Sequence, residues 1–261
     1  MNNANKNLVI ALLAILSVGS IGYIGYDKLN SDNNNNDNDN IVENEEEQYK
    51  LEDFTKIVNE ELGFLKSKKN LKDLTNEEKT YMLFSLLENR DNITINKLED
   101  IRKNSSLREM EVEYTDLLDT NNGYQLLSTV THTLNKDTGE YAYNIGTGRG
   151  GTPVWSRPFL TDFVEKDNQY ILSYKYAFTR SQGDGPTDLD LYYSLEDALN
   201  KKNIIKTFLL RDASENFQEL NWKIDTYLND NYDSIKAELD TYNYVFEVKE
   251  GNIILVDFYR N

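Results

Sequence analysis

Residues 242–259 read YNYVFEVKEGNIILVDFY, two runs rich in aromatic and β-branched side chains on either side of Glu250-Gly251. Runs of this composition are typical of strands, and a glycine between them supplies the positive φ that a tight turn needs. The segment therefore predicts an antiparallel β-hairpin.

Upstream of this hairpin, apolar residues recur at helical spacing and then at strand spacing. The helical stripe consists of Phe217, Leu220, Ile224, Tyr227, Leu228, Ile235 and Leu239. The strand face consists of Tyr170, Leu172, Tyr174, Tyr176 and Phe178. The same patterns predict further strands at about 124–134, 140–146, 159–166 and 203–210, and a short helix after Ser194.

Three helices are expected in the preceding part of the chain. The first carries an apolar stripe of Leu51, Phe54, Val58, Leu62 and Leu65, and it ends in a lysine-rich run. Thr75 and Glu78 make a capping box for the second, and Thr94 precedes the third. We therefore expect an α+β fold, with a helical segment at 49–112 and an α+β domain at 113–261. That domain would hold a mostly antiparallel twisted sheet, one long late helix and the C-terminal hairpin.

Residues 1–27 have the pattern of a signal anchor. The run 8–26 carries no charge over 19 residues, which as a helix spans about 30 Å. Lys6 precedes the run and Asp27 follows it, which places the N-terminus in the cytoplasm and the remaining chain outside the cell. The alternative is a cleaved signal peptide and a secreted protein, because Ser17, Gly19 and Ser20 supply small residues for a cleavage site.

Residues 28–48 are expected to be a disordered acidic linker. The stretch 31–50 holds seven carboxylates against the single Lys50 and little apolar surface to offset the entropy of ordering. The chain carries a net charge of -17 and has no basic run, which argues against nucleic-acid binding. Because it has no cysteine, disulfides, thiolate nucleophiles and thiolate metal sites are excluded.

The glycine-rich run IGTGRGGTPVW at 145–155 resembles a phosphate-binding loop only superficially. A Walker loop ends in Gly-Lys-Ser/Thr and runs into a helix, whereas here Pro153 and Pro158 follow. The run is therefore predicted to be a bend between two strands. Arg149 and Trp155 remain candidate binding residues, since a guanidinium among free backbone amides can hold a carboxylate or phosphate.

A second loop, SQGDGPTDLDLYY at 181–193, offers Asp184, Asp188 and Asp190 as oxygen ligands for weak calcium binding. Gly183, Gly185 and Pro186 explain the same segment as a turn. No other cofactor is predicted.

The single histidine, His132, lies mid-strand on an apolar face, which favours a structural role over catalysis. The tyrosines of the 169–179 strand, with Tyr141, Tyr143, Trp155 and Tyr192, are expected in the core, although an exposed platform for sugar or peptide is the alternative.

These patterns predict a membrane-anchored extracellular module that binds or scaffolds an envelope partner, either a protein or the cell wall, without catalysis. The alternative is an exported hydrolase that uses carboxylates on cell-wall sugar or peptide.

Overall fold

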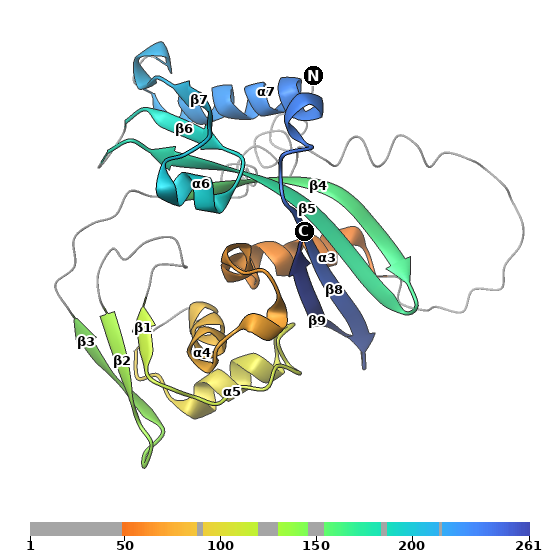
Figure 1. Ribbon diagram of the computed structural model, residues 1–261. Coiled ribbons are helices and arrows are strands. Elements are labelled where there is room, and N and C mark those ends of the chain that lie inside the picture. Colours follow the sequence, from red (N-terminus) through yellow and green to blue (C-terminus); the bar gives the residue numbers. More distant parts are fainter. Residues whose placement is uncertain (1–48, 88–90, 120–129, 146–153, 184–186, 214–215) are drawn as a thin grey trace, which may run out of the picture.

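The computed structural model describes residues 49–87, 91–119, 130–145, 154–183, 187–213 and 216–261 (Figure 1). The predicted anchor at 8–26 and the linker at 28–48 lie outside these residues. The α-helices are α3 (Leu51–Glu60), α4 (Asn76–Ser85), α5 (Ile95–Lys103), α6 (Leu195–Asn200) and α7 (Phe217–Ile235). Among the described helices, none combines the length and the apolar character needed to cross a membrane.

The described strands form two antiparallel sheets, which makes the fold α+β as expected. The small sheet contains β1 (Leu117–Asp119), β2 (Val130–Asn135) and β3 (Glu140–Ile145). The large sheet contains β4 (Val154–Lys166), β5 (Gln169–Ser181), β6 (Leu189–Tyr192), β7 (Ile204–Phe208), β8 (Thr241–Lys249) and β9 (Asn252–Arg260).

Strand β5 organises the large sheet because it pairs along both of its edges. One edge pairs with β4 over almost its whole length. The other edge pairs first with β8, at residues 169–175, and then with β6, at residues 178–181. The β8–β9 hairpin and the β6–β7 pair therefore lie end to end along one strand (Figure 1).

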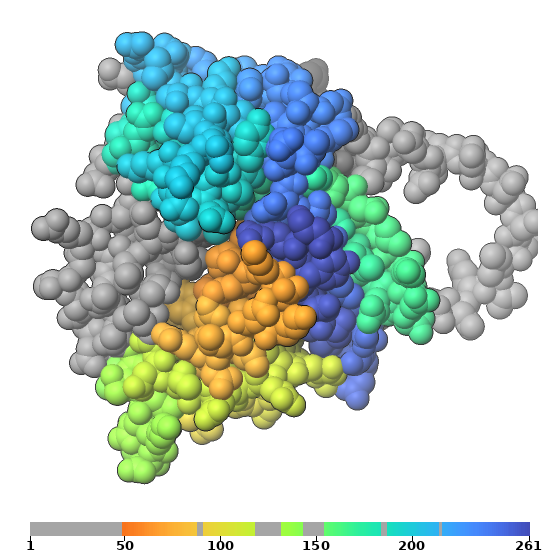
Figure 2. Space-filling view, viewed as in Figure 1, coloured from red at the N-terminus to blue at the C-terminus, as the bar shows by residue number. Residues whose placement is uncertain are grey.

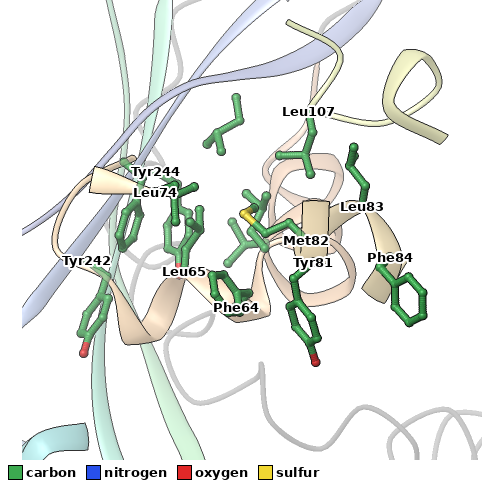
Figure 3. Close-up of a cluster of buried hydrophobic side chains, with 14 of the residues drawn as sticks. Phe64, Leu65, Leu74, Tyr81, Met82, Leu83, Phe84, Leu107, Tyr242 and Tyr244 are labelled. Atoms are coloured by element: carbon green, nitrogen blue, oxygen red, sulfur yellow. The ribbon is translucent and has the colours of Figure 1, made fainter. Parts of the chain in front are cut away.

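Each face of this sheet carries its own apolar cluster. On one face, Tyr176, Tyr242 and Tyr244 pack against the N-terminal helices, where Phe54 lies with its ring centroid 5.4 Å from that of Phe246. Figure 3 shows part of this cluster, with Tyr242 and Tyr244 beside residues of α4 and the segment before it. The other face packs against α7. The buried tyrosines are core residues, so the alternative of an exposed tyrosine platform is wrong for Tyr174, Tyr176 and Tyr192.

Local capping signals in the sequence are confirmed. Thr75 accepts a hydrogen bond from the Glu78 amide, and Glu78 in turn accepts one from the Thr75 amide. Thr94 caps α5 and Ser194 caps α6 through the same kind of hydroxyl acceptor. These bonds satisfy amides at helix N-termini that have no partner within the helix.

Two elements have bounds in the structure that differ from those predicted from the sequence. The first helix ends at Glu60, and the residues from Gly63 to Ser67 form a 3-10 helix, η1, instead of continuing it. Glycine is a poor helix former, which accounts for the break. Strand β4 begins at Val154 rather than near 159, and it includes Pro158. Proline is tolerated there because β4 pairs with β5 and with no other strand in the described part of the chain.

His132 is buried on β2, and its ring centroid lies 4.5 Å from that of Phe84. The predicted apolar surroundings of this histidine are confirmed.

Candidate functional site

The structure separates the site residues suggested by the sequence. Arg149 and Asp184 lie outside the described residues, and so does most of the glycine-rich run, whose flanks are β3 and β4. Trp155 is partly buried on β4, with its ring centroid 5.8 Å from that of Phe217. It lies with the apolar cluster beneath α7, whereas Tyr192 lies in the cluster on the opposite face. Asp190 is two residues from Tyr192 on β6 and therefore shares that face.

The aspartates at 188 and 190 have structural hydrogen bonds. Asp188 Oδ1 accepts from the Leu210 amide at 2.7 Å. The buried Asp190 accepts from Thr207 at 2.6 Å and from Gln182 at 2.9 Å, both at Oδ1. Its Oδ2 accepts from the Tyr192 hydroxyl at 3.3 Å. Both carboxylates therefore hold neighbouring segments together, and within the described residues no group of three His, Asp or Glu side chains is placed to hold a metal ion.

The surface pocket between α3, residues 104–106 and the β8–β9 turn has a volume of about 510 Å³. Its carboxylates also serve the fold. Asp53 accepts from the Lys50 amide at 2.9 Å, and Glu61 accepts from the Ser106 amide at 2.8 Å. These two carboxylates are therefore already engaged in holding neighbouring segments together.

The outer surface of α7, unlike this pocket, presents an exposed aromatic side chain, Trp222. Asn216 caps this helix by accepting from the amides of Gln218 and Glu219. One side of the helix packs on the sheet through Leu220, Ile224 and Leu228, which are essentially fully buried. In the space-filling view α7 lies at the top of the molecule, beside β6 and β7 (Figure 2).

Polar side chains fix α7 to the sheet as well. The guanidinium of Arg157 on β4 contacts Asp225 at 3.1 Å and also donates to Asn221. Its Nε lies 3.4 Å from the Thr179 hydroxyl. On the helix surface, Lys223 pairs with Glu219 at 3.2 Å and donates to the Asp212 carbonyl. The middle of α7 is therefore held in one orientation.

Trp222 projects from this fixed segment, and 65% of its surface is exposed. It follows Asn221 directly and precedes Asp225 by one helical turn, so Arg157 holds the backbone on both sides of it. The sequence offered a signal for this residue, because Trp222 lies off the apolar stripe of an amphipathic helix. Trp222 was nevertheless not predicted as a binding residue, because the predicted binding residues came from the two loop motifs.

Comparison of the chain with protein-family models, with curated proteins and with solved structures finds no match.

Proposed function

We propose that this protein is a membrane-tethered extracellular module that binds an envelope or surface partner, with Trp222 at the centre of the contact. The observation that carries the proposal is the exposed indole on a helix fixed to the sheet. Tryptophan combines a large apolar surface with a hydrogen-bond donor, and it is enriched at the few interface residues that supply most binding energy.

The rigid attachment of α7 supports the same proposal. An interface residue that is already ordered before binding loses less conformational entropy when the complex forms. The Arg157 contacts to Asn221 and Asp225 order the helix backbone around Trp222 in the unbound protein. Tethering by residues 8–26 would place this surface outside the cell, with residues 28–48 as a spacer.

The carboxylate-dependent hydrolase receives less support from the described residues. A glycosidase of that kind needs one carboxyl group kept protonated beside a second one. Burial raises the pKa of the Asp225 carboxyl, but the partner of Asp225 is Arg157 rather than another acid.

A photo-crosslinking experiment in cells that express the full chain tests the binding proposal. A photoreactive phenylalanine analogue at position 222 should give one discrete adduct. The same analogue at Ile204, which is 46% exposed on β7, is the matched control and should give none. Trp222→Ala should also abolish co-purification of the crosslinked partner. Equal adducts at both positions, or none at 222, would contradict a contact centred on α7.

A further inference from the structure

The amine of Lys66 in η1 reaches across to β4 and lies 3.1 Å from the hydroxyl oxygen of Ser156. It also lies 5.0 Å from the ring centroid of Tyr176. Within the described residues Lys66 forms no ion pair with a carboxylate, whereas the nearby Lys68 pairs with Glu78. Lys66 is partly buried, and removing an unpaired charge from water even in part is costly.

The surroundings of Lys66 make its charged form less favourable than it is in water. Burial lowers the pKa of the Lys66 amine from 10.5 to about 8. Among the described residues, the groups in contact with the amine are the Ser156 hydroxyl and the Tyr176 ring, and neither carries a charge. Tyr176 is fully buried, its hydroxyl lies 3.5 Å from that of Tyr244, and burial raises its pKa well above 10. In the structure Lys66 Nζ donates to Ser156 Oγ at 3.1 Å, and once the amine has lost its proton its lone pair lies at the same distance to accept the proton of the serine hydroxyl.

Ser156 lies on a strand that has one strand partner in the described part of the chain. It is partly buried near the start of β4, and its hydroxyl contacts Lys66. β4 pairs with β5 alone among the described strands, so its outer edge has the geometry that accepts an added peptide strand. Such a peptide would run past Ser156.

We propose that Ser156 and Lys66 form a nucleophile and general-base pair for acyl transfer, acting on an ester or amide carbonyl in an extended chain. This activity goes beyond the proposed binding function, and it replaces the carboxylates of the alternative hydrolase by an amine base. Lysine acts as the base for serine nucleophiles in unrelated folds, and a base within hydrogen-bond reach of the nucleophile is the geometric requirement.

The steps balance with water as the only co-substrate. Ser156 Oγ forms a bond to the carbonyl carbon while its proton passes to Lys66 Nζ. The carbon's bond to the leaving oxygen or nitrogen then breaks, and Lys66 Nζ returns the proton to that atom. Water attacks the resulting serine ester, gives one proton to Lys66 Nζ, and Ser156 Oγ regains a proton as the acid departs.

Labelling of the full-length protein with a fluorophosphonate probe tests the proposal, because the oxygen of a base-activated serine displaces fluoride from such probes and becomes phosphonylated. Mass spectrometry should locate the label on Ser156, and Ser156→Ala should remove it. The labelling rate should rise with pH around a midpoint of about 8, the pKa of the Lys66 amine. Lys66→Arg keeps the positive charge but removes the base, so it should slow labelling by at least ~100-fold. Lys68→Arg is the matched control and should label at the wild-type rate.

Two outcomes would overturn the proposal: no label on Ser156 of the folded wild-type protein, or an unchanged rate in Lys66→Arg. If Lys66→Arg does not fold, a wild-type rate that is flat between pH 6 and 10 would contradict it equally. Trp222→Ala should label normally, so failure of this activity and failure of the α7 contact are distinguishable.

Discussion

Arg157 on β4 and Asp225 on α7 form an ion pair, with Nη1 and Oδ1 3.1 Å apart, at the junction between the sheet and its long helix. Burial raises the pKa of the Asp225 carboxyl even though Arg157 beside it acts in the opposite direction. The negative charge of Asp225 is therefore less favourable in the folded protein than in water. The Arg157 guanidinium, by contrast, serves Asp225, Asn221 and Thr179 together.

The two partners should therefore respond unequally to substitution. Arg157→Met leaves Asp225 partly buried without a cation, and it should lower the free energy of unfolding by about 2–4 kcal/mol. Asp225→Asn keeps an oxygen acceptor for Arg157 and should cost less than about 1 kcal/mol. Urea unfolding measures both. Arg211→Met, at an arginine with 80% of its side chain exposed, is the control and should change stability by less than about 0.5 kcal/mol. A larger loss in Asp225→Asn than in Arg157→Met would contradict this account.

The turn of the C-terminal hairpin depends on backbone geometry. Gly251 has a φ of +76°, a conformation that side chains with a Cβ rarely adopt. Gly251→Ala should lower the free energy of unfolding by about 1–2 kcal/mol, although the added Cβ would meet no close neighbour.

Gly63 provides the matched control for Gly251, because it has no positive φ and open space around its missing Cβ. Gly63→Ala should leave the free energy of unfolding unchanged or raise it by up to about 1 kcal/mol. Equal losses in the two variants would mean that φ at Gly251 is not the cause.

Most strands, the caps and the buried tyrosines were predictable because their signals are local, whereas β1 was not predicted and the prediction of a turn at 181–193 was wrong for residues 189–192, which form the buried strand β6. The hydroxyl of Thr75 and the carboxylate of Glu78 are three residues apart, and the alternation of Tyr174 and Tyr176 is visible in the sequence itself. The Lys66–Ser156 contact was not predictable, since 90 residues separate its partners and only the fold brings them together. Before folding, Lys66 is one of several lysines in a charged run.

Acid should weaken the protein partly through Glu99. Hydrogen bonds from Arg102 and Tyr114 lower the pKa of the Glu99 carboxyl from 4.5 to about 2. The folded state therefore binds this proton less readily than the unfolded state, and the stabilisation is present above pH 4.5 and lost as pH falls towards 2. Glu99→Gln should be less stable than the wild type at pH 6, and the difference should shrink as pH falls below 4.5.

The control for this pH dependence is Glu60→Gln, a change at an exposed position of α3. Its difference from the wild type is the reference with which the Glu99→Gln difference is compared. A Glu99→Gln difference that does not change with pH would show that the hydrogen bonds of Glu99 add no pH-dependent stability.

Topology is tested by proteolysis of intact cells. With Lys6 on the cytoplasmic side of the run at 8–26, added protease should remove the chain after residue 27. The fragment should appear without lysis, and a cytoplasmic marker protein should stay intact. Protection of the chain until the cells are lysed would contradict the proposed orientation and the extracellular contact on α7.

Alkaline pH should stabilise the folded protein through Lys66. The pKa of the Lys66 amine is about 8 in the folded protein, whereas the ordinary value of 10.5 applies to the unfolded chain. Between these values the unfolded state binds the proton and the folded state does not, so the free energy of unfolding rises with pH. The slope from one group cannot exceed about 1.4 kcal/mol per pH unit.

Lys66→Met retains a long apolar side chain but does not titrate, so it isolates this effect. The wild type should gain stability relative to Lys66→Met as pH rises from 8 to about 9.5, a range below the usual pKa of tyrosine. Urea unfolding at several pH values measures the difference, with Lys68→Met measured alongside as the reference. A difference that stays flat across this range would mean that Lys66 remains fully protonated in the folded state, and then it could not serve as the base for Ser156.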